Sequence, residues 1–330
     1  MPYNNPIKIL KKNIFKKNDL VILIPTFKSA QITINTITLI GERNKNIGYD
    51  IIVVDNEGQD YGEIQKVFPE INFIVLERNV GSSGSQHIAL KVAMEYCYKY
   101  YCLSDNDAIP LDKDLFSSQI EYLETHNDCG AVLPYRVGRS QGEVKNAEFH
   151  YFMINQRVAE KVGLPNPDYF LSFDDIDYST RIYQADLYIF RIEKKYYHPY
   201  TKHSSLFNPS IYFRTRSLLI FLFNKNIFTK FKYGYTLYFF QYVGFHLFHS
   251  LTLWDGSIIK TITKALLDFL KPNLTLVHPI NKFAFKPIDE EHGLSDFQLE
   301  KKRLFLYFGK KFVNNENGVS NYFQLVRIGD

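Results

Sequence analysis

The sequence is poor in the residues that disulfide-linked and zinc-bound folds require. Its 330 residues include only three cysteines, Cys97, Cys102 and Cys129, and these form no CxxC pair. Their spacing argues against a structural zinc site, and an odd count predicts a reducing compartment. The segment 1–17 is rich in lysine and lacks the apolar core of a signal peptide, so we expect no export.

An excess of charge of one sign is also missing. The formal net charge is +4, and no arginine-rich stripe is present. Proteins that bind nucleic acid concentrate lysine and arginine on one face or along one helix. We therefore expect no nucleic-acid partner.

Two common phosphate-binding fingerprints are absent as well. The first apolar run, 20–26, is followed by Phe27-Lys28-Ser29, and neither GxGxxG nor GxxxxGK[ST] occurs after it. The chain therefore lacks the signature of Rossmann dinucleotide-binding proteins and that of P-loop proteins. No internal repeat is present.

What the chain does have is a series of apolar runs of strand length. Residues 20–26, 51–54 and 71–76 are continuous rather than alternating, as in strands buried on both faces of a parallel sheet. Residues 29–42 alternate locally, but their place between two such strands favours a crossover helix. We predict an α/β fold: a Rossmann-like mixed sheet with flanking helices.

Polar residues follow these strands at their carboxyl ends. Asp55-Asn56 comes after the second run, and Asn79 opens the glycine-rich element 79–86, which leads into a helix. Ligands of open α/β sheets bind outside the carboxyl ends of the strands. Small residues at a helix N-terminus let a ligand approach and leave backbone N–H groups for it. The element 79–86 therefore favours a ligand site, with a flexible turn as the alternative.

Two carboxylates stand one residue apart after a further apolar run, 100–103. The motif reads Asp105-Asn106-Asp107. Two acidic side chains at a strand tip suit Mg²⁺ or Mn²⁺, completed by the phosphates of a substrate. Asp and Asn are also ordinary turn residues, so this motif on its own favours a solvated turn.

Taken together, these motifs resemble those of a known family. Ile24-Pro25-Thr26, Val53-Val54-Asp55-Asn56, Asn79-Val80-Gly81 and Asp105-Asn106-Asp107 are similar in order and spacing to the successive motifs of family 2 glycosyltransferases. These are inverting enzymes of the GT-A fold. The resemblance implies that Asp107, together with Asp105, holds a divalent cation, Mn²⁺ or Mg²⁺; the alternative for Asp105 is to face the ribose. The nucleotide-sugar contacts that it implies are Pro25, Thr26, Phe27, Asp55, Asn56, Asn79, Gly81, Asp105 and Arg216.

A second acidic motif lies later in the chain. Asp174, Asp175 and Asp177 stand at the start of a predicted helix. By its position in the resemblance, Asp175 is the base that deprotonates the acceptor hydroxyl, with Asp174 as its neighbour. Crowding of carboxylates raises the pKa of at least one of them, which suits a general base near neutrality. Acidic residues also suit the positive end of a helix dipole, and this is the purely structural alternative.

The resemblance implies a histidine as a further metal ligand, and two candidates exist. His198, followed by Pro199, resembles the galactofuranosyltransferase pattern, and His203 resembles the rhamnosyltransferase variant. We favour His198. Arg216 is a candidate diphosphate contact, although Ser217 stands where the family usually has Asn.

The C-terminal third differs in composition from the rest. Aromatic residues make up 16% of the chain, and many of them follow residue 210. Residues 233–254 carry no formal charge, and they predict either an interfacial helix or an ordinary core helix. Helices are also expected at 260–270 and near 297–308. We divide the chain into a basic leader of little regular structure (1–18), a catalytic domain (19–208) and a helical region (209–330).

The sequence thus predicts an inverting, metal-dependent glycosyltransferase. Its donor would be a nucleotide sugar of the UDP-galactofuranose type, with dTDP-rhamnose as the alternative. Its acceptor would be a glycan or a lipid-linked glycan in surface polysaccharide synthesis, at the inner face of the cell membrane. Two rivals are a non-catalytic nucleotide-sugar or glycan-binding protein on the same scaffold and a nucleotidyltransferase.

Overall fold

The computed structural model describes residues 9–12, 15–198, 209–253 and 256–270. All of them belong to one compact unit that runs from Met1 to Val277. His203 and the helix expected near 297–308 lie outside the described residues. The boundaries at residues 18 and 208 stay predictions.

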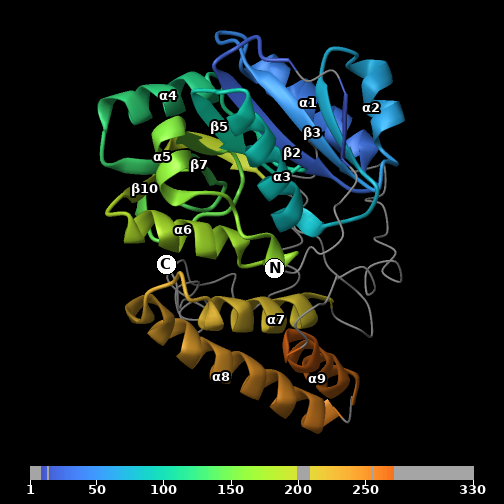
Figure 1. Ribbon diagram of the computed structural model, residues 1–330. Coiled ribbons are helices and arrows are strands. Elements are labelled where there is room, and N and C mark those ends of the chain that lie inside the picture. The colour runs from blue at the N-terminus through green and yellow to red at the C-terminus, as the bar shows by residue number, and fades with distance from the viewer. Residues whose placement is uncertain (1–8, 13–14, 199–208, 254–255, 271–330) are drawn as a thin grey trace, which may run out of the picture. The chain divides into compact units, whose positions relative to one another are not determined.

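The described strands form one mixed sheet with the order β1-β4-β3-β2-β5-β9-β7-β10-β6 (Figure 1). The parallel half consists of β4 (Asn72–Leu76), β3 (Asp50–Asn56), β2 (Leu20–Thr26) and β5 (Tyr100–Leu103). These are the strands that the sequence predicts, and each begins and ends within a few residues of its apolar run. Their carboxyl ends therefore meet at one edge of the sheet.

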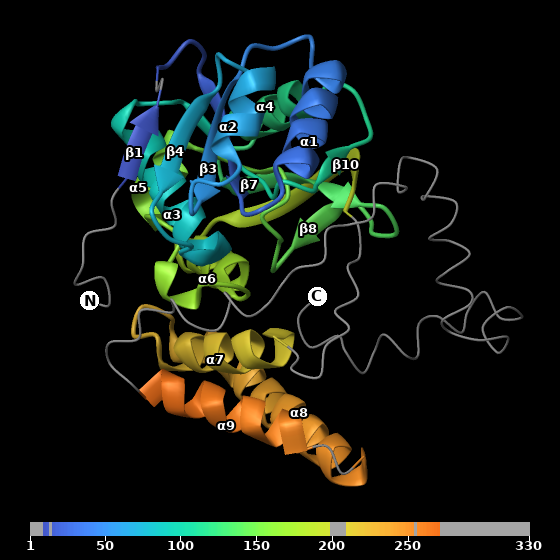
Figure 2. The same ribbon diagram turned by 90° about the vertical axis from the view of Figure 1, so that its right-hand side faces the viewer.

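Both faces of the sheet are covered, which explains why these runs do not alternate (Figure 2). In β2, Val21 and Leu23 pack on the face covered by α3 (Gly81–Glu95), α5 (Gln156–Val162) and α6 (Asp174–Gln184). Leu20 and Ile22 pack on the other face, under α1 (Ala30–Arg43), α2 (Tyr61–Val67) and α4 (Leu115–Thr125). Burial on both sides therefore requires an apolar residue at every position.

The helix expected at 29–42 is confirmed as α1. Its buried positions include Thr33, Thr36, Ile37 and Ile40, which repeat at the helical spacing of three and four residues. The local alternation of Ile and Thr indicated a strand only because threonine counts as polar. In α1, threonine is part of the buried stripe.

The N-terminal leader is more ordered than the sequence predicts. Within it, β1 (Ile9–Lys12) pairs antiparallel with β4, from Ile9 opposite Leu76 to Lys12 opposite Phe73. We expected little regular structure here, and for these four residues the expectation is wrong. The strand is recruited by the unpaired backbone of the sheet edge, and a sequence pattern does not report that backbone.

The second half of the sheet is largely unpredicted. It contains β9 (Phe152–Asn155), β7 (Cys129–Arg136), β10 (Tyr188–Tyr197), β6 (Ile109–Pro110) and β8 (Gly142–Val144). Of these, β10 begins on the strand-like run 187–192 of the sequence and extends five residues beyond it. This extension matters because it brings His198 to the same region as Asp107.

Three helices follow the sheet domain: α7 (Pro209–Phe223), α8 (Thr229–Leu253) and α9 (Gly256–Leu270). They pack on one another, and α7 also contacts the short 3-10 helix η1 (Pro167–Tyr169). Figure 2 shows α7 beside α8 and α9. The contact with η1 places this region against the segment that carries the acidic motif.

The helix α8, which covers most of the predicted helix 233–254, has a packed face and an exposed face. Tyr235, Tyr238 and Phe239 pack into a cluster with Leu218 and Phe221 of α7. The opposite stripe of α8 is exposed and contains Tyr233, Leu237, Phe240, Phe245 and Phe248. Among the described residues, no helix combines the length and the apolarity that crossing a bilayer would need.

Candidate active site

Two aspartate and two histidine side chains meet at the carboxyl edge of the sheet. Asp105 and Asp107 follow β5, and His198 follows β10. His150 stands just before β9 and was not among the predicted site residues. Its Nε2 lies 3.1 Å from Oδ2 of Asp105, and Nε2 of His198 lies 3.1 Å from Oδ1 of Asp107. The two imidazole rings have centroids only 4.3 Å apart.

Three of these residues have the geometry of a metal-ligand set. One donor atom each of Asp105, His150 and His198 lies within 4.8 Å of the other two. A carboxylate with two imidazoles is a donor set that suits first-row divalent cations. The hydroxyl of Tyr196 lies 3.0 Å from Nδ1 of His150, and such a partner on the second nitrogen orients a ligating imidazole. The residues present therefore fit a divalent cation.

Asp107 stays a predicted cation ligand. It lies outside the set of three and is ion-paired with His198. Burial tends to raise the pKa of Asp107, but the hydrogen bond and charge of His198 and the charge of His150 outweigh it, so the pKa lies below its usual value. Asp107 is therefore an anion that orients His198 in this structure, whereas Asp105 faces His150.

The acidic motif opens α6 beside this cluster. Burial, followed by the charges of Asp175 and Asp105, raises the pKa of Asp174 well above its usual range. The pKa of Asp175 rises to about 6, because of burial and the nearby charge of Glu148. The charges of Asp105 and His150 also act on Asp175, so the predicted base and the predicted cation site share one electrostatic environment.

Asp55 has a carboxylate oxygen suited to a ligand. The side chain is fully buried, and its Oδ2 accepts hydrogen bonds from the backbone N–H groups of Asp60 and Tyr61 at 3.0 and 2.8 Å. Its Oδ1 has no partner among the described residues. Burial and the charge of Asp60 raise the pKa of Asp55 to about 6, against the pull of these N–H groups. Oδ1 is thus a buried acceptor that lacks a donor.

The other predicted nucleotide contacts at the first strand tips hold loops in place. Oγ1 of Thr26 donates to Oδ2 of Asp60 at 2.6 Å, between a buried Pro25 and a half-buried Phe27. Asn56 donates to Oγ of Ser85 at 2.6 Å and accepts from the backbone N–H of Val80 at 3.0 Å. These bonds tie the end of β3 to the glycine-rich element.

Asn79 and Gly81 shape the start of α3. Oδ1 of Asn79 accepts the backbone N–H of Gly81 at 2.7 Å. Gly81 has φ +77, and a Cβ there would lie 2.1 Å from the carbonyl oxygen of Phe170. Only glycine fits both the left-handed backbone and this approach. The glycine-rich element is therefore packed directly against the acidic segment 168–175.

Arg216 belongs to the acidic segment rather than to the metal-ligand set. It is 7% exposed, and its Nη1 donates to the carbonyl oxygen of Asp168 at 2.9 Å. Burial raises the pKa of Asp168, against the lowering effect of the Arg216 charge. The predicted diphosphate contact of Arg216 stays a prediction.

Local pattern gave no signal for His150. It lies in the aromatic run Phe149-His150-Tyr151-Phe152, where a histidine reads as a core residue. Only the antiparallel pairing of β9 with β5 brings the start of β9 next to the end of β5, with Phe152 opposite Leu103. The pairing places His150 within reach of Asp105.

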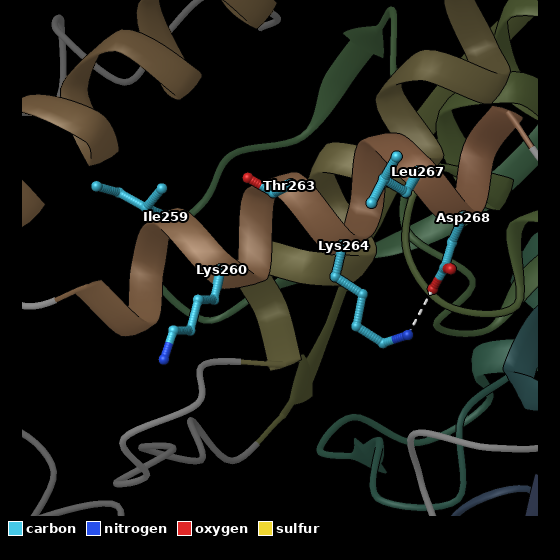
Figure 3. A pocket seen from close by; sticks show the side chains of 6 residues that line it. All are labelled: Ile259, Lys260, Thr263, Lys264, Leu267 and Asp268. Atoms are coloured by element: carbon cyan, nitrogen blue, oxygen red, sulfur yellow. Dashed lines mark hydrogen bonds and ion pairs between the residues drawn. The ribbon is translucent and has the colours of Figure 1, made fainter.

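A separate hollow lies on α9 (Figure 3). It is lined by Ile259, Lys260, Thr263, Lys264, Leu267 and Asp268. Its carboxylate, Asp268, is already paired with Lys264 at 2.9 Å and with the hydroxyl of Tyr212 at 2.7 Å. This hollow contains none of the clustered acidic and imidazole residues.

Comparisons with known proteins give one matching family and several solved structures of similar fold. Residues 21–219 match the family described as "Glycosyl transferase family 2". No curated protein matches the chain. Among solved structures, the mannosyltransferase PcManGT from Pyrobaculum calidifontis, in complex with GDP-Man and Mn²⁺, aligns with a TM-score of 0.53 at 13% identity, over 93% of this chain and 85% of its own.

A second solved structure gives a similar result. TarS 1-349 of S. aureus, in complex with UDP-GlcNAc, aligns with a TM-score of 0.51 at 15% identity. The alignment covers 76% of this chain and 80% of that one. At these identities the likeness concerns the fold, which is the predicted GT-A arrangement of a mixed sheet with flanking helices.

Proposed function

We propose, since the chain belongs to glycosyl transferase family 2 and is a glycosyltransferase, that it is an inverting, cation-dependent enzyme that uses a nucleoside-diphosphate sugar. The acceptor in this proposal is a hydroxyl of a glycan or a lipid-linked glycan. The observation that carries the proposal is the meeting of two groups at one sheet edge. Asp105, His150 and His198 form a donor set that suits a divalent cation, and the charges of Asp105 and His150 act on Asp175, whose pKa is about 6.

Asp175 has the properties of the base. With a pKa of about 6 it is mostly ionised at neutral pH, yet it is more basic than an ordinary aspartate. It accepts the proton of the acceptor hydroxyl as the hydroxyl oxygen attacks the anomeric carbon. One displacement, with the nucleoside diphosphate leaving from the opposite side, inverts the configuration. Burial, followed by the charges of Asp175 and Asp105, raises the pKa of the neighbouring Asp174 well above the usual range.

Asp105, His150 and His198 would hold the divalent cation. When bound, such a cation neutralises the charge that develops on the departing nucleoside diphosphate. Two imidazole ligands favour Mn²⁺ over Mg²⁺, because Mg²⁺ prefers oxygen ligands in a strict octahedron. Asp107 keeps His198 in place, and Tyr196 does the same for His150.

Asp55 is the residue best placed to read the nucleobase. Its unpartnered Oδ1 can accept an N–H from the base edge. Burial raises the energetic cost of leaving this oxygen unpaired, so a ligand that supplies the donor gains affinity. Pro25, Thr26 and Phe27, at the adjacent strand tip, would form one wall of the same pocket.

We favour galactofuranose as the transferred sugar and keep rhamnose as the alternative. The support is the sequence pattern alone, namely Asp174-Asp175 followed by His198-Pro199. Surface polysaccharide synthesis is the setting in which either sugar would be used.

A donor screen tests the proposal. The full-length chain is incubated with a panel that includes UDP-galactofuranose, dTDP-rhamnose, UDP-GlcNAc and GDP-mannose, each with Mn²⁺, with Mg²⁺ and with EDTA. Release of nucleoside diphosphate with one donor, dependent on the cation, is the expected result. Tight nucleotide binding without turnover of any donor would instead support a non-catalytic binding protein.

We also propose a peripheral contact with the membrane. The exposed stripe of α8 contains Tyr233, Leu237, Phe240, Phe245 and Phe248 and no formal charge. Exposed Ile259 and Leu267 of α9 stand among Lys260 and Lys264 (Figure 3). Aromatic and leucine side chains beside lysines suit the interface of an anionic bilayer. This surface would hold the enzyme next to a lipid-linked acceptor.

A further inference from the structure

The segment that delivers the acidic motif has a strained backbone. Phe170, Ser172 and Phe173 have φ values of 64, 67 and 71, although none of them is glycine. Such a backbone is unfavourable for any residue other than glycine and persists only where its surroundings enforce it. Phe173 is the residue directly before Asp174, so this strain determines where α6 and its carboxylates begin.

On one side the segment is held by α3. The carbonyl oxygen of Phe170 accepts the backbone N–H of Ser83 at 3.3 Å, and Gly81 leaves room for that carbonyl. The hydroxyl of Ser83 donates to the carbonyl oxygen of Asn166 at 2.5 Å. These contacts hold the segment on the α3 side, and residues 169–173 have further partners.

Those partners come from α7. The hydroxyl of Ser217, which is fully buried, lies 3.1 Å from the carbonyl oxygen of Tyr169 and 3.0 Å from that of Leu171. The ring of Phe213, one helical turn earlier, stacks on Phe170 with centroids 5.3 Å apart and planes at 8°. Ser217 thus contacts the residues on both sides of Phe170, and Phe213 contacts Phe170 itself.

The same helical region also contacts the last residue of the strained backbone, Phe173, and the first turn of α6. The Phe173 ring contacts those of Phe221 on α7 and Tyr235 on α8, each with its centroid 6.0 Å away. Asn224, which follows α7, donates to Oδ1 of the buried Asp177 at 2.9 Å. The helical region therefore contacts Phe173, directly before Asp174, and Asp177, two residues after Asp175.

From this arrangement we infer that Ser217 and Phe213 are positioning residues for the base Asp175, acting through the strained segment 168–175. The inference rests on the proposed function, because it gives α7 a part in the transfer reaction rather than in stability alone. Displacement of a catalytic group by about 1 Å can cost 100-fold in rate. A segment that relaxes toward ordinary φ values would move Asp175 on that scale.

Three variants of α7 separate positioning from general stability. Ser217→Ala removes the shared hydroxyl donor, and Phe213→Leu removes the ring stacked on Phe170. Thr215→Val is the matched control, since Thr215 is fully buried on the same helix and its hydroxyl has no partner among the described residues.

Hydrogen exchange of the full-length proteins, without any ligand, is the first measurement. We expect peptides within 168–177 to exchange at least about 10-fold faster in Ser217→Ala and Phe213→Leu, and at the wild-type rate in Thr215→Val. Faster exchange spread evenly over all peptides would report lost global stability and would overturn the inference. Unchanged exchange in 168–177 would overturn it as well.

Steady-state kinetics with the donor found by the screen is the second measurement. We expect kcat to fall about 10- to 100-fold in both variants. The dissociation constant of the nucleoside diphosphate with Mn²⁺ should stay within about twofold, since Asp55 and the cation ligands are untouched. Faster exchange combined with a wild-type kcat would overturn the positioning role. If no donor is turned over, the proposed function fails, while the exchange experiment still decides whether α7 holds the segment.

Discussion

At the residue scale, the site is a close cluster of carboxylates and imidazoles. His150 and His198 face Asp105 and Asp107, and the charges of Asp105 and His150 reach Asp175 on another element. The carboxylates differ in pKa. The pKa of Asp107, beside the imidazoles, is lowered, whereas the pKa of Asp174 at the start of α6 is raised. Environments that push pKa values apart are a common way of assigning different roles to identical side chains.

The first prediction concerns His150. We expect His150→Ala to weaken Mn²⁺ binding at least about 10-fold, because even outer-shell partners contribute 10- to 100-fold to metal affinity. The paramagnetic resonance signal of free Mn²⁺ during a titration measures this without any turnover. His126→Ala is the control, since His126 is exposed at the end of α4. Equal Mn²⁺ affinity in both variants would remove His150 from the ligand set.

The second prediction concerns Asp175. Asp175→Asn should keep nucleotide binding and lower kcat by about 100- to 10,000-fold, the usual contribution of a general base. Isothermal titration with the nucleoside diphosphate and a coupled assay of its release measure the two quantities separately. Turnover at the wild-type rate would show that Asp175 is not the base.

The third prediction follows from the pKa of Asp175. The base acts in its ionised form, and its pKa is raised to about 6. Activity should therefore be full above about pH 7 and should fall as the pH drops through 6, about tenfold per unit below it. A pH profile of kcat between 4.5 and 8 measures this. An acid limb centred near 4, as for an ordinary aspartate, would contradict the assignment.

At the scale of elements, the start of α3 and the acidic segment fit one another. The fourth prediction is that Gly81→Ala lowers the free energy of unfolding by about 1–2 kcal/mol from the left-handed φ alone, and further through the contact with the Phe170 carbonyl. Gly62→Ala in α2 is the control, because a Cβ there meets nothing within 4 Å. We expect a Tm several degrees lower for Gly81→Ala and an unchanged or higher Tm for Gly62→Ala. Equal Tm values would show that the close approach is not required.

At the scale of the whole molecule, the C-terminal helices have two distinct surfaces. One surface packs on the acidic segment through Phe173 and Tyr235, and the other exposes Phe240, Phe245 and Phe248 at 67%, 63% and 68%. Scattered apolar residues on a surface are ordinary, whereas several large exposed apolar side chains on one helix support the membrane contact that we propose. The two surfaces can therefore be altered separately.

The fifth prediction tests the exposed surface. Phe240→Ser combined with Phe245→Ser should weaken flotation with vesicles of anionic phospholipid at least about 10-fold and leave donor turnover in solution intact. The control is Val67→Ser, an exposed apolar residue at the end of α2. Flotation equal to that of the wild type in the double variant would show that this stripe is not the membrane contact.

The contrast between sequence and structure is clearest in the histidines. His198 was predicted because it belongs to a pattern, His198-Pro199, that resembles a family. His150 was not predicted, because its importance comes from the antiparallel pairing of β9 with β5. Long-range pairing joins residues that are 45 positions apart, and no local period encodes it.

The sequence by itself determined the strands of the parallel half, since burial on both faces requires the continuous apolar runs from Leu20 to Leu103. It also determined the order of the carboxylate motifs, because side chains that follow such strands must emerge at one edge. Only the tertiary structure decided which of them meet. In the folded chain, Asp107 pairs with His198 and Asp105 pairs with His150. Ser217 donates a hydrogen bond to the carbonyl oxygen of Leu171, in the strained turn before Asp174. Those contacts depend on strand order and on helix packing across the chain, which are properties of the folded molecule rather than of any one segment.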